Sequence, residues 1–311
     1  MVTTLDVRAR DGRLCADLGH PSRTGPPEAF DIGRLLVSWR RLLWAAACIG
    51  ALVPAFEVRA ESKLTIVAYN VESDGAEAST VAKEVEAIED ADIWGFSEVA
   101  SRDWLEEFEA AAEKATGSDF GAILGTTGVY DDPDRSPDYL GLLYNSKRLE
   151  RVGRHRELHS MNDWNHRSPL VARFRHVGGK AEFVIVLVHL ASGDSELRMQ
   201  QSWQLREWTF MRDVPVIMMG DFNYRWVIDE SDDDPPQAYS ALTAGGTLRW
   251  VRPKPLLNTW CGNSRSVFDF FFVNEPALRW RGVADVIQAA CKKSDKKVSD
   301  HRPVRAVFAL D

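Results

Sequence analysis

The sequence has few cysteines, no long hydrophobic stretch and no excess of positive charge. Its four cysteines, at positions 15, 48, 261 and 291 of 311 residues, exclude a disulfide scaffold, and no CxxC spacing supports a zinc–thiolate site. Because 38 Lys and Arg face 46 Asp and Glu, the net charge of -8 gives no sign of a basic nucleic-acid surface. The composition, 45% hydrophobic and 27% charged, excludes a disordered or collagen-like chain.

The longest apolar run near the N-terminus is typical of a secretory signal. Two arginines precede the run 42–56, which is short for a membrane span, and Val58 and Ala60 provide the small residues that a signal peptidase requires. We therefore expect a signal peptide over 37–60 and a secreted or periplasmic protein with no stable membrane span in its mature form. An uncleaved membrane anchor is the alternative.

The chain before this run shows no sustained periodicity, so residues 1–36 are either a disordered extension or a mis-assigned start. Residues 1–60 hold eight basic and six acidic side chains, which leaves 30 basic and 40 acidic residues and a mature charge of -10. Only Cys261 and Cys291 remain after cleavage. In an oxidising compartment they could form a disulfide, and two buried thiols are the alternative.

Residues 61–311 read as one domain, because no linker, repeat or low-complexity block divides them. Strands are predicted at 64–70, 92–99, 138–145, 169–176, 182–190, 214–222, 266–273 and 303–310, and helices at 79–90, 103–115 and 195–213. Several of the strands are apolar on both faces and must be covered on both sides. The prediction is an α/β fold, a four-layer β-sandwich flanked by helices. Trp203, Trp208 and Phe210 have the spacing of core residues in the last helix.

Polar side chains recur where these apolar strands end. Asn70 and Glu72 follow the first strand, and Asp221 and Asn223 end the strand 214–222, each pair two residues apart and so on one side of the chain. Glu98 lies in an apolar run, and a carboxylate there needs a partner. Further candidates at strand ends or inside strands are His189, Asp269, Asp300 and His301.

In this order, the segments resemble the endonuclease/exonuclease/phosphatase superfamily, the fold of deoxyribonuclease-like enzymes. The resemblance covers nearly the whole chain after the signal. Its motifs are NVE at 70–72, SEV at 97–99, RSPL at 167–170, VHL at 188–190, GDFN at 220–223, FDF at 268–270 and SDH at 299–301.

The resemblance implies a metal-dependent phosphodiesterase. Glu98 is then the main metal ligand, helped by Asn70 and Glu72, with Asp300 on the opposite side of the site. Oxygen ligands of this kind suit Mg²⁺, with Mn²⁺ or Ca²⁺ as possible substitutes.

The resemblance also assigns catalytic roles. His301, held by Asp269, and His189 become the general base and acid, while Asp221 and Asn223 orient the attacking water and hold phosphate oxygens. The remaining assignments are Asp138 as the carboxylate partner of His189 and Arg167 as a phosphate clamp.

The substrate is left open, because one catalytic frame serves DNA, RNA, phospholipids and inositol phosphates. An endonuclease acting on nucleic acid as a monomer is the leading expectation, with a phospholipase C-like enzyme or a small-molecule phosphatase as alternatives. A catalytically dead binding module ranks lower, because every motif residue is present. Basic residues gather at 147–156 and 292–297, and we interpret both groups as solvated loops.

Overall fold

The computed structural model describes residues 62–128, 138–161, 166–180, 182–262, 264–288 and 297–310. The expected extension 1–36, the signal peptide 37–60 and Cys291 lie outside these ranges. Cys261 is disulfide-bonded. Within the described ranges, no helix is both long and apolar enough to cross a membrane.

The first sheet has six strands in the order β12-β13-β1-β2-β4-β3. Its strands are β1 (Ser62–Asn70), β2 (Ile93–Val99), β3 (Phe120–Leu124), β4 (Tyr139–Asn145), β12 (Val283–Val286) and β13 (Val304–Leu310). Only β1 and β2 pair in parallel, and the other pairs are antiparallel. The two parallel strands therefore end at the same edge of the sheet.

The second sheet has seven strands, six of them in the order β10-β11-β9-β8-β7-β5, with β6 also paired to β7. Its strands are β5 (Leu149–Arg151), β6 (Arg156–Glu157), β7 (Leu170–His176), β8 (Glu182–His189), β9 (Val216–Val227), β10 (Leu248–Trp250) and β11 (Ser266–Asn274). Here the only parallel pair is β8 and β9. Each sheet thus contributes one parallel pair.

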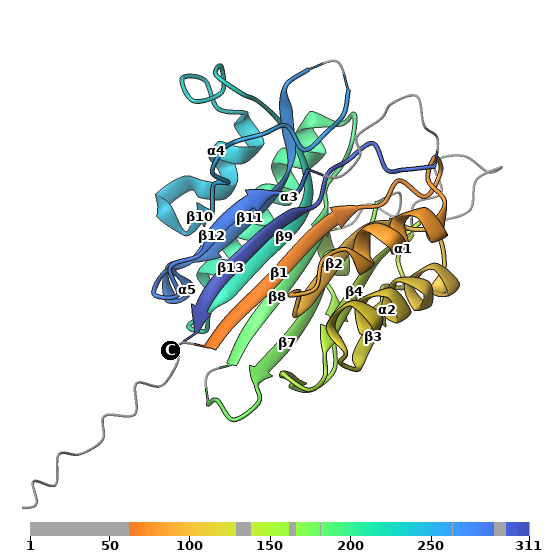
Figure 1. Cartoon of the computed structure of the whole chain (residues 1–311). Coiled ribbons are helices and arrows are strands. Elements are labelled where there is room, and N and C mark those ends of the chain that lie inside the picture. The colour runs from red at the N-terminus through yellow and green to blue at the C-terminus, as the bar shows by residue number, and fades with distance from the viewer. Residues whose placement is uncertain are drawn as a thin grey trace, which may run out of the picture. The chain divides into compact units, whose positions relative to one another are not determined.

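Helices cover the outer faces of both sheets (Figure 1). These helices are α1 (Ala78–Glu86), α2 (Arg102–Thr116), α3 (Ser195–Phe210) and α4 (Gln237–Thr243). The short helix α5 (Glu275–Leu278) instead packs Ala277 and Leu278 against the core between the sheets. Side chains alternate along β1, so that Ile66 packs between the sheets and Val67 packs in the cluster that contains Phe108 of α2. On the second sheet, Phe222 faces outward into a cluster that contains Leu205 of α3. The predicted four-layer α/β sandwich is confirmed.

The prediction missed the short elements. All eight predicted strands and three predicted helices form, but β3, β5, β6, β10, β12, α4 and α5 were not anticipated. Strand β9 continues to Val227, beyond the predicted end at 222. Strands of two to five residues carry too few side chains to show a period of two, and they form here because a long neighbour supplies the hydrogen bonds.

The core assignment for the aromatic residues of α3 is wrong for two of the three. Trp203 is 51% exposed and Phe210 is 76% exposed, while Trp208 is partly buried against the core. The buried stripe of α3 is formed instead by Gln201, Ser202, Leu205 and Thr209.

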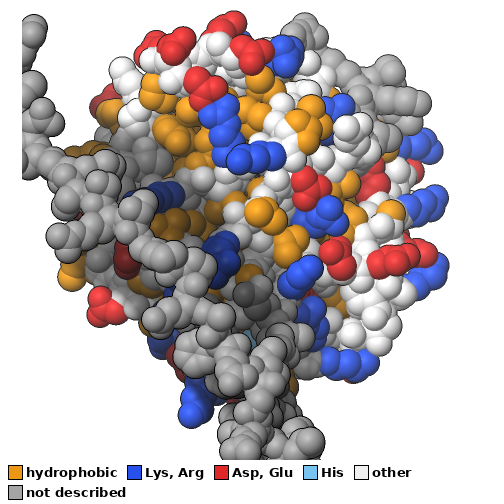
Figure 2. All heavy atoms as spheres, turned by 60° about the vertical axis from the view of Figure 1, so that its left-hand side comes forward, with side chains coloured by type: hydrophobic (Ala, Val, Ile, Leu, Met, Phe, Trp, Pro, Cys, Tyr) orange, Lys and Arg blue, Asp and Glu red, His pale blue; other side chains and the backbone are white. Residues whose placement is uncertain are grey.

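Figure 2 brings forward the side of the molecule with α4 and β10, where hydrophobic side chains gather among charged ones.

Gly220 allows the closest backbone approach in the second sheet. Its φ is +126°, and a Cβ atom there would lie 2.1 Å from the carbonyl oxygen of Val188 on β8. The next residue, Asp221, pairs with His189 across the same two strands. A side chain at 220 would therefore push apart the strands that carry two candidate site residues.

Replacing this glycine should cost stability. We expect Gly220→Ala to lower the free energy of unfolding by on the order of 2 kcal/mol or more, because both the φ angle and the contact are unfavourable. Gly178→Ala is the matched control: its φ is +78°, but a Cβ atom would meet nothing within 4 Å, so about 1 kcal/mol is expected. Urea unfolding measures both variants, and equal losses would contradict the close approach at Gly220.

Candidate active site

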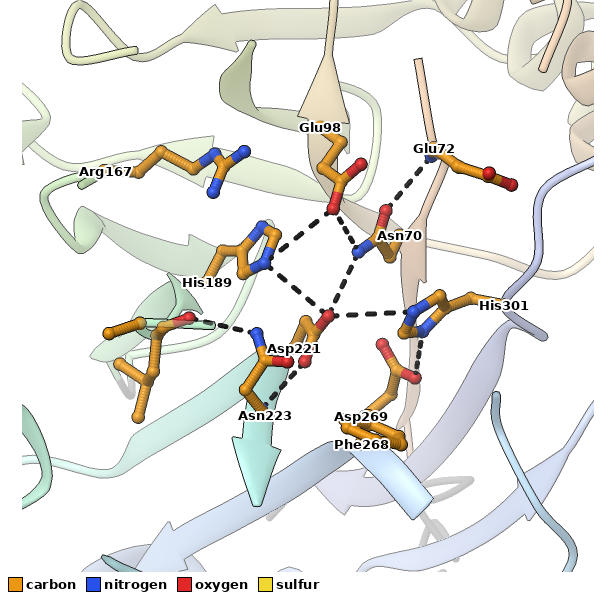
Figure 3. Close-up of polar contacts among 12 residues, drawn as sticks. Asn70, Glu72, Glu98, Arg167, His189, Asp221, Asn223, Phe268, Asp269 and His301 are labelled. Atoms are coloured by element: carbon orange, nitrogen blue, oxygen red, sulfur yellow. Dashed lines mark hydrogen bonds and ion pairs between the residues drawn. The ribbon is translucent and has the colours of Figure 1, made fainter. Parts of the chain in front are cut away.

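The candidate site lies where the parallel strands of the two sheets end. Asn70 and Glu98 come from the ends of β1 and β2, and His189 and Asp221 come from β8 and β9, where they are register partners. His301 reaches the same place from the segment before β13 (Figure 3). The fold thus brings together side chains that are up to 231 residues apart in sequence, from Asn70 to His301.

Asn70 joins the two sheets through its side-chain amide. Its Oδ1 accepts a hydrogen bond from the backbone N–H of Glu72 at 3.0 Å, and its Nδ2 donates to Glu98 Oε1 at 2.9 Å and to Asp221 Oδ2 at 3.0 Å. A backbone N–H can only donate, so the amide oxygen must face it and the NH₂ group must face the carboxylates. Asn70 therefore positions the two acids in this structure, and its role as a metal ligand stays a prediction.

Glu98 has an unusual backbone conformation for its residue type. Its φ is +61°, at an irregularity between β2 and β4. Non-glycine residues rarely adopt this conformation, and it concentrates at functional sites. Burial raises the pKa of Glu98, although the guanidinium of Arg167 opposes the shift. The contacts from Asn70 and His189 both reach Oε1, and no described residue contacts Oε2.

Asp221 is the centre of the hydrogen-bond network. Its side chain is buried, with Oδ1 accepting the backbone N–H of Asn223 at 2.8 Å and Oδ2 accepting the Asn70 amide. Burial raises its pKa well above the usual range of an aspartate, with the nearby Asp269 adding to the shift. Asn223 has a φ of +53° and donates its own amide to the carbonyl of Leu190 at 3.0 Å.

His301 and Asp269 form a buried pair, as predicted. The imidazole Nδ1 lies 2.8 Å from Asp269 Oδ2. Burial alone would lower the pKa of His301, but the charge and hydrogen bond of Asp269 outweigh it and raise the pKa to about 10. Ser299 fixes the segment, because its hydroxyl donates to the carbonyl of Asn70 at 2.6 Å and accepts the N–H of His301 at 3.0 Å.

His189 faces the same acids but has the opposite pKa shift. Its Nε2 lies 3.6 Å from Asp221 Oδ2 and 3.8 Å from Glu98 Oε1, while its buried Nδ1 has no hydrogen-bond partner. Burial lowers the pKa of His189 well below 6.5, and the positive charge of Arg167 adds to the effect. His189 is therefore neutral at physiological pH.

The predicted pairing of Asp138 with His189 is wrong. Both carboxylate oxygens of Asp138 are held by Arg167, through Nε and Nη2. A guanidinium is permanently charged and its two parallel N–H groups match a carboxylate, so it binds Asp138 better than a neutral imidazole can. Arg167 is 9% exposed and its guanidinium extends towards the site (Figure 3).

Glu72 and Asp300 lie at the edge of the site. Glu72 Oε2 accepts the backbone N–H of Asp300 at 2.7 Å, and burial together with the Asp300 charge raises the pKa of Glu72 to about 7. Its carboxylate points away from Glu98 (Figure 3). Asp300 Oδ2 accepts the indole N–H of Trp260 at 2.8 Å. The roles of Glu72 and Asp300 as metal ligands stay predictions, since both carboxylates are engaged by N–H donors at the edge of the site.

Two places in the site could hold a cation. Asp221, Asp269 and His301 offer ligand atoms within 4.8 Å of one another, but a cation among them would compete with the Asp269–His301 hydrogen bond. Glu98 fits a divalent ion better, because it is a partly buried carboxylate whose Oε2 has no described partner. Hard oxygen donors of this kind suit Mg²⁺, which keeps several of its waters.

Three supporting residues were missed by the sequence. Ser299 could have been found, since it belongs to the SDH motif. Trp260 and Thr259 had no signal in the sequence. The Thr259 hydroxyl accepts the backbone N–H groups of Phe268 at 2.9 Å and Asp269 at 3.2 Å, which anchors the start of the FDF segment.

The sequence profile of the Endonuclease/Exonuclease/phosphatase family matches residues 67–301. The chain belongs to this family. A search of curated proteins gave no significant match. Members of the family are phosphoric ester hydrolases, and the matched range begins in β1 and ends at His301.

Solved structures share the fold at low sequence identity. A mannosyl-6-phosphatase from Bacteroides thetaiotaomicron is 17% identical with a TM-score of 0.56, covering 79% of this chain and 100% of its own. TDP2 of D. rerio, in complex with a single-strand DNA product, is 14% identical with a TM-score of 0.60, covering 79% and 99%. The human Nocturnin catalytic domain with a bound sulfate is 16% identical with a TM-score of 0.57, covering 80% and 95%.

Removing the Asp269 charge should release the proton from His301. In Asp269→Asn without added metal, the pKa of His301 should fall well below its wild-type value of about 10, because burial remains and the largest opposing charge is gone, while Asp221 and Asp300 still raise it. NMR titration of the imidazole, assigned with His301→Ala, measures the change.

The same pair should make stability depend on pH. The pKa of His301 is higher in the folded protein than in the unfolded chain. Its protonation therefore stabilises the fold fully below ~pH 6.5, and this contribution is lost as pH rises towards 10. The wild-type advantage over Asp269→Asn in free energy of unfolding should therefore be larger at pH 6 than at pH 9.5. A constant advantage would contradict a charged pair.

Proposed function

We propose that this protein is a secreted or periplasmic, divalent-metal-dependent phosphodiesterase that acts as an endonuclease on DNA or RNA. One observation carries the proposal: the Nε2 atoms of His189 and His301 lie 3.6 and 3.8 Å from the same oxygen, Asp221 Oδ2. Two imidazoles and a carboxylate that converge in this way can contact one phosphate group and one attacking water.

Glu98 is the residue best suited to hold the metal, with Asp300 as a second oxygen donor at the edge. A bound divalent ion would neutralise charge on the non-bridging phosphate oxygens. Asn70 supports this role indirectly, because its amide holds Glu98 and Asp221 at fixed positions. Mg²⁺ is the proposed ion, with Mn²⁺ or Ca²⁺ as substitutes.

Asp221 is better placed than His301 to act as the general base. Its raised pKa brings a carboxylate close to the pH at which a base works best. His301 carries a proton at neutral pH because Asp269 holds it, so it cannot accept another one. In this scheme Asp221 takes the proton of the attacking water, which revises the role that the family resemblance assigned to His301.

The remaining side chains stabilise charge on the phosphate. The imidazolium of His301 can donate from Nε2 to the phosphate or to the leaving oxygen, and neutral His189 can donate from its own Nε2. Asn223 can donate the second N–H of its amide, since the first is used by Leu190. These donors are fixed before substrate arrives, which is the arrangement that favours a developing negative charge.

The choice of nucleic acid as substrate rests on family membership, the expected export signal and the TDP2 relative, whose structure holds a single-strand DNA product. The mannosyl-6-phosphatase relative keeps a small-molecule phosphate ester as the main competing outcome of the assay.

Plasmid nicking tests the proposal. The full chain should nick plasmid DNA with Mg²⁺ and lose this activity in EDTA. Asp221→Asn and His301→Ala should lower the rate by ~10² to 10⁴-fold, and Glu98→Gln by on the order of 10²-fold with a higher metal requirement.

Glu150→Gln is the matched carboxylate control, because Glu150 is exposed on β5 and paired only with Arg175 at the surface. It should leave the rate unchanged. Hydrolysis of a sugar phosphate or phospholipid without nicking would contradict nucleic acid as the substrate and leave the proposed mechanism intact. Nicking without a metal would contradict the mechanism as well.

The pH profile distinguishes the two candidate bases. With Asp221 as base, kcat/KM should rise about tenfold per pH unit below the pKa of Asp221 and fall again as His301 loses its proton. His301→Gln should remove the alkaline fall. A wild-type rate that keeps rising through the titration of His301 would return the role of base to that residue.

A further inference from the structure

A second site candidate lies at the opposite end of the second sheet. A groove of about 450 Å³ opens between the segment joining β5 to β6 and the C-terminal end of α3. Val184 near the start of β8 and Val214, two residues before β9, line it. The catalytic cluster lies at the other ends of these strands, and from Val184 to His189 the chain advances ~16 Å.

The charges in the groove are mostly positive. Four arginines and one aspartate line it: Arg154, Arg156, Arg173, Arg212 and Asp213. Only Arg173 has a carboxylate partner among the described residues, Glu182 at 2.9 Å. Such a cluster of guanidinium groups without carboxylate partners attracts an anion.

Two of the arginines share an aromatic support. The guanidinium carbon of Arg212 lies 4.3 Å from the ring centre of Trp208, and that of Arg156 lies 5.9 Å from it. Trp208 is itself held against the core of the second sheet. A guanidinium over an indole is held in place with its N–H edge available to a ligand. Burial and the charge of Arg156 also lower the pKa of Arg212, as expected for two cations held close together.

We infer that this groove binds phosphate groups, either as the free anion or as carried on a single-stranded oligonucleotide. Guanidinium edges donate paired hydrogen bonds that match phosphate oxygens, and three unpaired arginines can contact one phosphate or two successive ones. The sequence analysis interpreted Arg154 and Arg156 as solvated, and both are exposed in the structure, where they line the groove together with Arg212.

A lipid surface is the main competing partner, because Phe210 and Met211 next to the groove are 76% and 72% exposed. A bilayer docked here would hold the catalytic cluster on the far side of the protein, away from the lipid. This placement therefore favours a soluble phosphate ligand over a membrane.

Binding can be measured without catalysis. The full chain in EDTA at low salt is titrated with inorganic phosphate by calorimetry and with a fluorescein-labelled ten-residue oligothymidylate by anisotropy. The double variant Arg156→Gln/Arg212→Gln should weaken binding of at least one probe by about tenfold or more, since charge-assisted hydrogen bonds are lost. Arg212→Lys, which keeps the charge but loses the planar fork, should weaken it in part.

Arg265→Gln is the matched control. Arg265 is 71% exposed and paired with Asp229 at the surface, so its removal should change neither affinity by more than twofold. Hydrolysis of bis-p-nitrophenyl phosphate with Mg²⁺ should be unchanged in every one of these arginine variants, which separates the groove from the catalytic cluster.

If phosphate binds and displaces the oligonucleotide, the groove binds the phosphates of a nucleic-acid backbone. If phosphate binds and the oligonucleotide does not, the ligand is the free anion. Both results support the groove. Equal affinities in wild type and the double variant would overturn it, whatever the hydrolysis assay shows. Binding to phosphatidylserine vesicles with neither soluble probe bound, lost in Phe210→Ser, would replace it with a membrane surface.

Discussion

The site depends on one hydrogen-bonded amide, that of Asn70, which holds carboxylates from two different sheets. Glu98 belongs to the first sheet and Asp221 to the second, and only the NH₂ group of Asn70 donates to both. Two buried carboxylates placed so close repel each other and are poorly solvated. The amide offsets part of that cost, and the orientation of the amide is in turn fixed by the backbone N–H of Glu72.

The sequence predicted the layers and most of the site because long strands and short motifs carry strong local signals. The eight long strands alternate with turn residues, and the pairing of Asp269 with His301 was implied by the family resemblance that the short motifs carry. The prediction that failed in the site concerned a contact for which two groups distant in the sequence compete. Asp138 is 29 residues from Arg167 and 51 from His189, and no sequence pattern states that the cation, rather than the imidazole, takes the carboxylate.

Helix α3 shows a second limit, which concerns burial. Its aromatic residues recur at helical spacing, yet Trp203 and Phe210 face solvent while Gln201 and Ser202 are buried. Gln201 is accommodated because its amide accepts the N–H of Ala191 at 2.9 Å, just after the strand that carries His189. The polar contact that fixes the start of α3 near the site thus takes a position that periodicity assigns to an apolar residue.

Bulk charge is a poor guide to either end of this molecule. The catalytic cluster gathers acids at the carboxyl end of β8 and beside it in the middle of β9, and the arginine groove gathers cations near the amino ends of these strands, so both signs are concentrated although the sum is negative. An acidic cluster attracts a divalent ion and, without one, repels a phosphate. A positive groove ~16 Å away can hold a phosphate-bearing chain outside that repulsion, because the Debye length is ≈ 8–10 Å at physiological salt. The length of β8 sets the distance between the arginine groove and the acidic site. This distance lets the protein bind an anionic ligand although its catalytic cluster is acidic.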